Sequence, residues 1–373
     1  MEENKKKVQP HEELFDNSLN KVQEISNKKS AFYYVGIIFL NIFFLALFWI
    51  LIRQKENVAE YSEVIPTINW RYLWFSLAII VLILLLQIFP DYIAIFSKTK
   101  KRKFGVVTLA NNRLNFFNLV TSFSSGGYYT HANCLHSGGV SKQASIDVTY
   151  MKKLLSRISQ LVYTFLFVCI GTILYIKNIN IWIFVAGILA FLINCIVVIF
   201  ILFFGNRKEQ SLSFIAKLCK LLYKLKLIKN VDLTYKVMAN RLFVYSLNIK
   251  KHKKLNILYV VCNFISQFLR HFILFVIVQA LNFGSGEIFL EILFKCAILD
   301  MIISSFPFPK GTAIFEILFL CLFSSVFFSG YLLWGMIIYR LFDYFIYIII
   351  YLITLAIEKI FKINNLKAQK DVV

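Results

Sequence analysis

Long uninterrupted apolar runs limit what this chain can fold into more than any other feature. Residues 31–52, AFYYVGIIFLNIFFLALFWILI, carry no charged side chain, and a helix needs roughly 20 apolar residues to cross a bilayer core. Similar runs occupy residues 72–96, 158–176, 181–204, 256–281, 287–306, 313–329 and 331–356. Because lipid cannot satisfy open backbone groups, these runs predict an all-α integral membrane protein, a bundle of about eight transmembrane helices.

Positive charge sets the expected orientation. The chain has 41 Lys and Arg against 20 Asp and Glu, a net charge of +21, and cytoplasmic loops normally hold the excess of Lys and Arg. Basic residues gather in the predicted N-terminal segment 1–30, at 98–103, in the loop 205–254 and in the tail 357–373. We therefore predict a polytopic membrane domain over 31–356, with both termini and the loop 205–254 in the cytoplasm.

The loop 205–254 contains an amphipathic pattern. Within Ser211–Asn230, apolar residues recur at helical spacing opposite a stripe of lysines. Such a helix suits the anionic cytoplasmic leaflet, although a loop that only fixes topology would have the same composition. The basic residues of this loop are not accompanied by an aromatic platform or a recognisable nucleic-acid-binding module. We therefore expect no direct binding of nucleic acid.

Within the segment 104–157, residues 116–143 are too polar to span the bilayer and too apolar for a free loop. They contain two glycine pairs, Gly126-Gly127 and Gly138-Gly139, which permit turns that other residues resist. We expect a re-entrant or interfacial hairpin packed against the bundle, and an ordinary cytoplasmic loop is the alternative.

No metal or cofactor is expected. His131, Cys134 and His136 lie close together, but their spacing fits no standard zinc motif. The seven cysteines are scattered and form no CxxC pair. Nucleotide-binding and hydrolase signatures are absent from the sequence as well.

The stretch SSFPFPKGTAIFE, residues 304–316, predicts a broken helix. Pro307 and Pro309 cannot donate backbone hydrogen bonds, and Gly311 permits a sharp turn before the helix resumes. Free amide groups at the start of the second half would attract an anion, with Lys310 adding a full positive charge. A tight turn at the cytoplasmic face, with Lys310 simply solvated, is the alternative.

Ionisable residues also lie inside the last four apolar runs. Placing an ionised side chain in lipid costs free energy, so such residues normally face an oppositely charged partner or a water-filled cavity. They are Arg270, His271, Asp300, Glu316, Arg340 and Asp343. We expect Arg340 or Arg270 to pair with Glu316, Asp300 or Asp343, and Glu291 to pair with Lys295 four residues later. Together with the broken helix, these charges predict a polar cavity inside the bundle.

Three ordered motifs give the chain a family resemblance. The first lies in FFNLVTSFSSGGYYTHANCLHSGGVSKQASIDVTYMKKLLSRIS and consists of Phe117, Asn118, Thr121, Phe123, Gly126, Gly127, Gly139, Met151 and Lys152. The second is Pro307, Pro309, Gly311 and Glu316, and the third is Trp334, Arg340 and Tyr344. In this order they resemble the lysylphosphatidylglycerol synthase transmembrane-region family, which includes the membrane half of bacterial multiple peptide resistance factors. Lys310 stands where the second motif usually has glycine.

The resemblance implies lipid handling in a bacterial cytoplasmic membrane. Full-length relatives join this region to a domain that moves lysine from lysyl-tRNA to phosphatidylglycerol, and the membrane region is associated with translocating the product. We expect a protein that binds or flips an aminoacylated or anionic phosphatidylglycerol-type lipid, with Lys310, Arg340 and Arg270 holding a phosphate. Glu316 and Asp300 would pair with these cations or with a cationic headgroup. The whole predicted headgroup site comprises Gly126, Gly127, His131, Arg270, Asp300, Pro307, Pro309, Lys310, Gly311, Glu316 and Arg340.

Two other functions stay open. The chain could be the membrane subunit of a phosphatidylglycerol lysyltransferase whose catalytic domain is a separate soluble polypeptide, because its longest polar segment, 205–254, is far below the size of a domain. Alternatively, it could be a non-catalytic scaffold that binds a cell-envelope enzyme through this loop.

Overall fold

The chain is helical throughout its described part. The computed structural model describes residues 31–53, 61–121, 126–204, 216, 252–282, 286, 288–306, 309–311, 313–327 and 329–370. Within these residues the secondary structure consists of helices, with no strand. The predicted N-terminal segment 1–30 lies outside the described residues. So does nearly all of the predicted amphipathic loop at 205–254.

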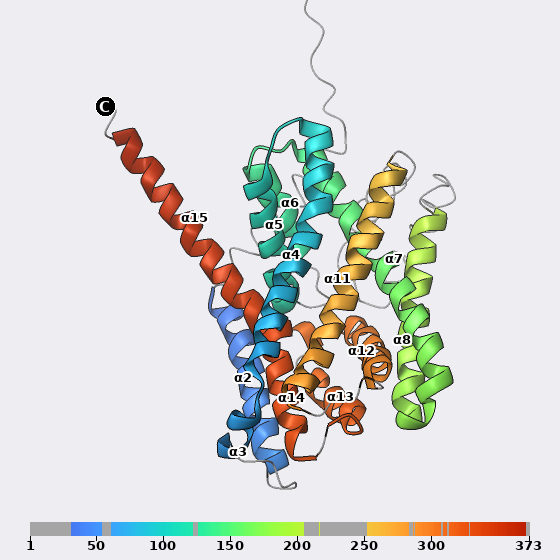
Figure 1. The fold of residues 1–373 in the computed structure, drawn as a ribbon. Helices are drawn as coiled ribbons and strands as arrows, with labels where there is room; N and C mark the ends of the chain where they lie inside the picture. Colours follow the sequence, from blue (N-terminus) through green and yellow to red (C-terminus); the bar gives the residue numbers. More distant parts are fainter. Residues whose placement is uncertain are drawn as a thin grey trace, which may run out of the picture. The chain divides into compact units, whose positions relative to one another are not determined.

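The helices follow one another along the chain as Figure 1 shows. The first half contains α2 (Ala31–Arg53), α3 (Tyr61–Thr67), α4 (Trp70–Thr99), α5 (Phe104–Val120), α6 (Gly126–Ser137), α7 (Lys142–Tyr175), η2 (Ile176–Asn178) and α8 (Ile181–Phe204). The second half contains α11 (Lys253–Ala280), α12 (Ile288–Ser305), η3 (Pro309–Gly311), α13 (Ile314–Phe323), η4 (Ser329–Tyr331), α14 (Leu332–Arg340), η5 (Leu341–Phe345) and α15 (Ile346–Lys370).

Local sequence explains where several helices begin and end. The side chain of Asn69 caps α4 by accepting a hydrogen bond from the Arg71 backbone N–H at 3.3 Å. Lys100 ends the same helix in a left-handed conformation, with φ of 57°. Ser141 caps α7 through a 3.4 Å bond from the Ala144 N–H. Thus the turns around α4 and α7 are specified by residues next to the apolar runs.

Five helical segments in the described part are long and apolar enough to cross a membrane. They are Trp70–Thr99, Lys142–Asn178, Ile181–Ile199, Lys253–Ala280 and Leu332–Lys359. The last is a continuous helix through α14, η5 and α15, in which η5 is a π-helical turn. The all-α membrane fold is therefore confirmed, whereas the predicted count of about eight spans is not.

Three of the eight predicted runs are not among these five: residues 31–52, 287–306 and 313–329, which correspond to α2, α12 and α13. Helix α13 has only 10 residues, which at a rise of about 1.5 Å per residue covers roughly half of a bilayer core. Helix α12 has 18 residues and carries Glu291, Lys295 and Asp300. Most residues of α12 are buried in protein, for example Phe294. Helix α13 buries one face, which includes Phe319, and leaves Ile317 49% exposed.

The chain forms two compact units. The first comprises Met1–Ile38 and Ile196–Lys253, and its described part is mainly the start of α2 and the end of α8. The second comprises Phe39–Cys195 and Lys254–Val373. All the residues of the site described below belong to this second unit.

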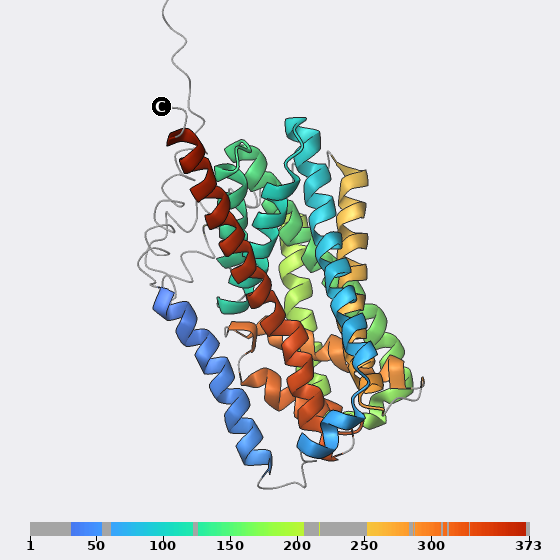
Figure 2. The same cartoon turned by 60° about the vertical axis from the view of Figure 1, so that its left-hand side comes forward.

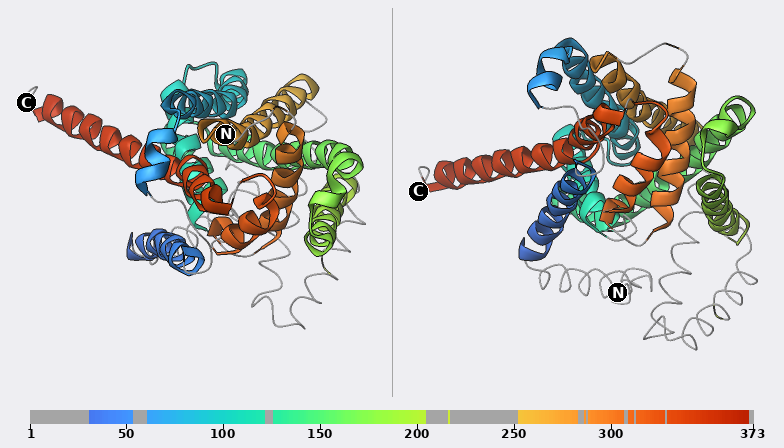
Figure 3. Two further views of the ribbon diagram at one scale, coloured as in Figure 1. Left: turned by 60° about the horizontal axis from the view of Figure 1, so that its bottom comes forward. Right: turned by 90° about the horizontal axis from the view of Figure 1, so that it is seen from below.

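Within the second unit, α4 and α11 run side by side (Figure 2) and are joined by a 2.6 Å hydrogen bond from Tyr259 to Asp91. Helices α12, α13 and α14 lie next to one another (Figure 3). Their apolar faces form the largest buried cluster with α11, in which Leu274, Phe319 and Met336 are completely buried. A second buried cluster, which includes Val107 of α5, Leu135 of α6 and Val148 of α7, packs these helices against α4 and α11.

Candidate functional site

A cavity of about 410 Å³ lies within the second unit. Residues of α4, α5, α6, α7, α11, α12 and α15 line it, together with η3 and η5. Its volume is in the range of pockets that hold small ligands. We call it the cationic cavity because of the charges on its wall.

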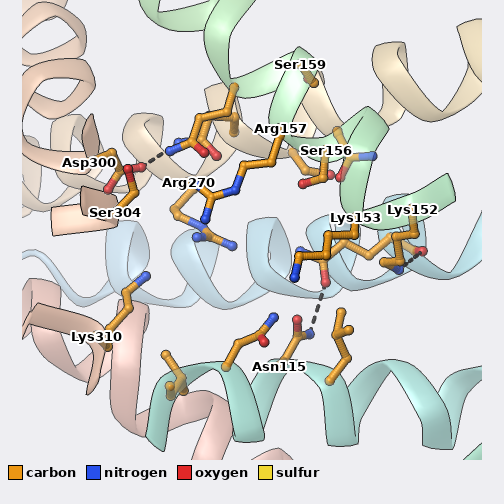
Figure 4. A pocket seen from close by; sticks show the side chains of 18 of the residues that line it. Asn115, Lys152, Lys153, Ser156, Arg157, Ser159, Arg270, Asp300, Ser304 and Lys310 are labelled. Carbon is orange, nitrogen blue, oxygen red and sulfur yellow. Dashed lines mark hydrogen bonds between the residues drawn. The ribbon is translucent and has the colours of Figure 1, made fainter. Parts of the chain in front are cut away.

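Five cationic side chains and two carboxylates line the cationic cavity. The cations are Lys152, Lys153 and Arg157 of α7, Arg270 of α11 and Lys310 of η3, and the carboxylates are Asp300 of α12 and Asp343 of η5. Figure 4 shows Lys153, Arg157, Arg270 and Lys310 around one space, with Asp300 and Ser304 at one side. The cations thus come from three separate segments of the chain.

Helix α7 supplies a polar face to the cavity. Lys153, Ser156, Arg157 and Gln160 follow one another at intervals of three, one and three residues, and all line the cavity. This spacing places them on one side of a helix. The apolar residues further along α7 then continue as a membrane span.

Two cations share the carboxylate of Asp343. Lys310 Nζ lies 3.4 Å from one carboxylate oxygen, and Arg270 Nε lies 4.0 Å from the other. Asp343 belongs to the π-helical turn η5, and π-turns inserted in α-helices are frequent at functional sites. The turn therefore joins α11 and the helix break at η3 through a single carboxylate.

Asp300 is held by the neighbouring helix. The side-chain amide of Gln267 donates to its Oδ2 at 2.5 Å, and His271 Nε2 lies 3.0 Å from the same oxygen. These bonds come from α11, so both acids of the cavity wall are already bonded to protein donors. They are nevertheless at the edge of the open space, since the Asp300 side chain is 21% exposed.

Behind Lys152 lies a buried polar network that joins five helices. Its centre is the carboxylate of Asp91 in α4, which is fully buried. This carboxylate accepts a hydrogen bond from Asn111 of α5 at 2.8 Å and another from Lys152 of α7 at 2.8 Å. Tyr259 of α11 donates a third, at 2.6 Å. His131 of α6 lies 3.2 Å away. Lys152 also donates to the Asn111 side chain and to a backbone carbonyl of α4, so its three donors are used inside the wall.

His131 takes part in this network through both nitrogens of its ring. It lies in α6, which is too short to span, and burial lowers the pKa of His131 below its usual value. A carboxylate can only accept, so His131 Nε2 donates to Asp91. Nδ1 lies 2.8 Å from the Thr149 hydroxyl, which donates its own hydrogen to the Ser145 carbonyl at 2.7 Å. The role of His131 seen here is to hold α6 against α4 and α7.

The predicted headgroup residues fall into two groups. Arg270, Asp300 and Lys310 line the cationic cavity. Arg340 and Glu316 are each 1% exposed and bond to each other at 2.6 Å, away from the cavity lining. They form one of the pairs expected from the sequence. The expected pair Glu291–Lys295 is present too, at 2.6 Å, and is also outside the lining.

The glycines of the first motif act in packing. Gly127 lies so close to α5 that an added Cβ would overlap the Leu114 carbonyl and the Asn118 side chain. The Gly126 N–H donates to the Thr121 hydroxyl at 3.0 Å. Neither glycine is among the residues that line the cavity, whereas the next residue, Tyr128, is. The segment predicted as a re-entrant or interfacial hairpin is thus a helical pair, α5–α6, and its depth in the bilayer stays a prediction.

The predicted helix break is present between α12 and α13. Pro309 and Gly311 lie in the short turn η3, and Pro307 lies outside the described residues. Lys310 has φ of 36° and Ala313 has φ of 66°, a left-handed region that residues other than glycine rarely adopt. This backbone turns Lys310 toward Asp343 instead of continuing a helix.

A family model described as the TM region of lysylphosphatidylglycerol synthase matches residues 34–350. The chain belongs to the lysylphosphatidylglycerol synthase TM region family. The match contains every residue that lines the cationic cavity, and with the five apolar helices it identifies a multi-pass membrane protein. No curated protein and no solved structure matches the chain.

The left-handed turn has a second consequence. The φ of 36° at Lys310 is a conformation that glycine adopts without strain, and the lysine side chain present here adds a cation to the cavity.

Sequence reasoning missed several polar residues of this site. Lys153, Arg157 and Tyr128 were not predicted as site residues, although Lys153 and Arg157 are spaced four apart, as on one face of a helix, and lie within α7. Asp91 was missed as well. It lies inside the apolar run predicted at 72–96, so the same test that singled out charges in the later runs would have found it.

Proposed function

We propose that this protein binds the headgroup of a membrane phospholipid in the cationic cavity and translocates that lipid between leaflets. The observation that supports this function is a 410 Å³ space lined by five cations among membrane-crossing helices. Charges at membrane depth normally mark a substrate path. A phosphodiester is the anion that every membrane phospholipid offers to such a path.

In the proposed mechanism the cations act as successive partners of the phosphate. Arg157 and Arg270 offer planar guanidinium groups, which suit bidentate contact with phosphate oxygens. Lys153 and Lys310 add charge on either side. Amides such as that of Asn115 would bond the hydroxyl groups of a headgroup. The broken helix at η3 resembles the discontinuous helices that many transporters place at a substrate site.

The setting of this activity is also part of the proposal. We place the protein in the bacterial cytoplasmic membrane with both termini in the cytoplasm, as the charge distribution indicates. Its partners would be membrane phospholipids and, through the cytoplasmic side, a soluble aminoacyltransferase or cell-envelope enzyme. Movement of charged lipid would alter the surface charge of the membrane.

Reconstitution tests the proposal. Vesicles containing the full chain and a fluorescent phosphatidylglycerol are treated with an impermeant quencher, and the rate at which inner-leaflet lipid becomes quenchable is recorded. Arg157→Gln and Arg270→Gln should each slow this rate by about tenfold, equivalent to about 1.4 kcal/mol. Lys98→Gln is the matched control, because Lys98 pairs with Asp147 outside the lining. Equal rates in all variants and in protein-free vesicles would exclude translocation.

A second candidate is the membrane part of a lysylphosphatidylglycerol synthase, which the description of the family favours. It is tested by incubating the purified chain with lysyl-tRNA and phosphatidylglycerol. Lysyl-lipid formed by this chain alone would indicate a complete enzyme. Product that forms only when a soluble aminoacyltransferase is added would indicate a subunit.

A further inference from the structure

A chain of three polar side chains runs from the protein core to the wall of the cationic cavity. His271 of α11 is fully buried, and its Nδ1 lies 2.9 Å from the hydroxyl of Tyr163 in α7. The other ring nitrogen, Nε2, lies 3.0 Å from Oδ2 of Asp300 in α12. Tyr163 is completely buried, whereas the Asp300 side chain is 21% exposed and lines the cavity. The cavity therefore meets this chain at Asp300.

This chain can hold an additional proton without losing either hydrogen bond. Because an ionised carboxylate only accepts, His271 Nε2 carries a hydrogen that it donates to Asp300. In a neutral ring, Nδ1 then accepts from the Tyr163 hydroxyl. In a ring with a second proton, Nδ1 donates to the same hydroxyl oxygen, which serves equally well as an acceptor. Histidine is the side chain whose ordinary pKa lies closest to neutral pH, so His271 is the group of this chain suited to exchanging a proton.

Cations near the pair oppose that second proton. Arg270 and Lys310 line the same cavity as Asp300 and interact with it electrostatically (Figure 4). Asp343 offsets part of their charge, since it lies 3.4 Å from Lys310 and 4.0 Å from Arg270. Further titratable groups face the pair from α7, α12 and α14, and their ordinary pKa values lie above neutral pH. They are Tyr163, Cys296 and Tyr339.

We propose that the Asp300–His271 pair is a proton-binding site, and that it takes up one proton when a phosphate anion occupies the cationic cavity. The inference rests on the proposed lipid-binding function and adds a proton to the ligands of the same site. A phosphate beside Arg270 and Lys310 offsets the positive charges that oppose protonation of the ring. Solvent supplies the proton, an N–H bond forms at Nδ1, and Tyr163 changes from donor to acceptor. By linkage, the proton then strengthens binding of the anion by the same factor.

Proton uptake on binding can be measured directly. The full chain in detergent is titrated with short-chain phosphatidylglycerol, whose phosphate stays ionised near neutral pH, by calorimetry in two buffers of different ionisation enthalpy. One coupled proton lets the dissociation constant rise with pH by at most about tenfold per unit. We expect affinity to be greatest at low pH, and to fall by about threefold or more from about pH 6 to about pH 8. The heat of binding should differ between the buffers in the sense of proton uptake.

Variants locate the proton. His271→Gln removes the ring, and Asp300→Asn removes the carboxylate that stabilises a charged ring. In each variant the pH dependence and the buffer difference should disappear while phosphatidylglycerol still binds. Asp300→Asn lies at the edge of the cavity and provides the test if the buried His271→Gln variant does not fold. His136→Gln is the matched control, because His136 bonds to the Val140 carbonyl outside the lining. It should retain both effects.

The outcomes separate this inference from the proposed function. Binding that is independent of pH and of buffer, but is still weakened by Arg270→Gln, would overturn the inference and leave the proposed function intact. Proton uptake that persists in His271→Gln or Asp300→Asn would overturn it as well. If phosphatidylglycerol did not bind, or bound equally well to Arg270→Gln, the proposed function itself would be overturned.

Discussion

Arg340 donates twice to one oxygen of Glu316: its Nε lies 2.9 Å and its Nη2 lies 2.6 Å from Oε1. Both side chains are 1% exposed, and the guanidinium carbon lies 3.7 Å from the centre of the Phe315 ring. The pair ties α13 to α14. Because α13 is too short to be fixed by crossing the bilayer, this buried ion pair sets its position.

The first prediction concerns this pair. Glu316→Gln leaves the Arg340 charge buried without its counter-ion, and we expect the free energy of unfolding to fall by about 3–5 kcal/mol. Changing both residues, Glu316→Gln with Arg340→Met, removes the uncompensated charge and should restore most of that loss. SDS unfolding titrations of the purified chain measure both. A double variant as unstable as the single one would show that packing, not charge, dominates here.

A second prediction compares two lysine–aspartate pairs. Lys152 meets the fully buried Asp91 at 2.8 Å, whereas Lys98 meets the partly exposed Asp147 at 2.6 Å. Lys152→Met should lower the free energy of unfolding by about 3–5 kcal/mol. Lys98→Met should lower it by less than about 1 kcal/mol, because water screens that pair. Similar losses in the two variants, measured by the same titration, would argue against the network described around Asp91.

The third prediction uses two glycines as a matched set. An added Cβ at Gly127 overlaps α5, whereas at Gly105 it would meet nothing within 4 Å. Gly127→Ala should therefore destabilise the chain by about 1–3 kcal/mol. Gly105→Ala should be neutral or stabilising by about 0.5–1 kcal/mol, because alanine favours a helix. Thermal denaturation in detergent distinguishes them, and an unaffected Gly127→Ala variant would contradict the close packing of α5 on α6.

Lys310 offers a test of backbone strain. Lys310→Gly and Lys310→Gln both remove the cation, but only glycine relieves the left-handed conformation at φ of 36°. The glycine variant should be more stable than the glutamine variant by about 1–2 kcal/mol. Unfolding midpoints in SDS provide the comparison. Equal midpoints would mean that this turn has no strain to relieve.

Hydration of the cationic cavity can be tested by thiol labelling. In a chain whose seven native cysteines are replaced by alanine, Ser156→Cys and Asn115→Cys should react with a charged methanethiosulfonate, since water is needed to form a thiolate. Leu189→Cys should react far more slowly, because Leu189 is 55% exposed on an apolar span and faces lipid. Equal reactivity at the three positions would contradict a water-filled cavity.

The apolar runs predicted most of the fold, and the reason lies in the physics of lipid. A run such as Trp70–Thr99 has one way to satisfy its backbone in a bilayer, so length and composition are enough to identify a crossing helix. A span is not confirmed at α13, where a similarly apolar sequence forms a helix of only 10 residues, and protein buries one face of it. Periodicity does not separate these two environments, because both exclude water.

The candidate site was predicted only in part. Arg270, Asp300 and Lys310 stood out as charges beside a helix break, and they line the cavity. Arg340 stood out for the same reason, but it forms a buried ion pair with Glu316 and does not line the cavity. Charge inside an apolar run reveals that a polar partner exists. It does not reveal whether that partner is another side chain or an open space, since this depends on packing between distant helices.

Asp91 has a consequence for how the nascent chain matures. Three of its donors, Asn111, His131 and Lys152, follow within 61 positions, but Tyr259 is 168 positions away. At about 5–20 residues per second, the ribosome needs on the order of 5–20 s to make the 107 residues from Lys152 to Tyr259 (259 − 152). During this interval the inserted helices hold a carboxylate that is one bond short. The network around Asp91 is therefore completed only after α7 and α8 have been made, and before α12 to α15 exist.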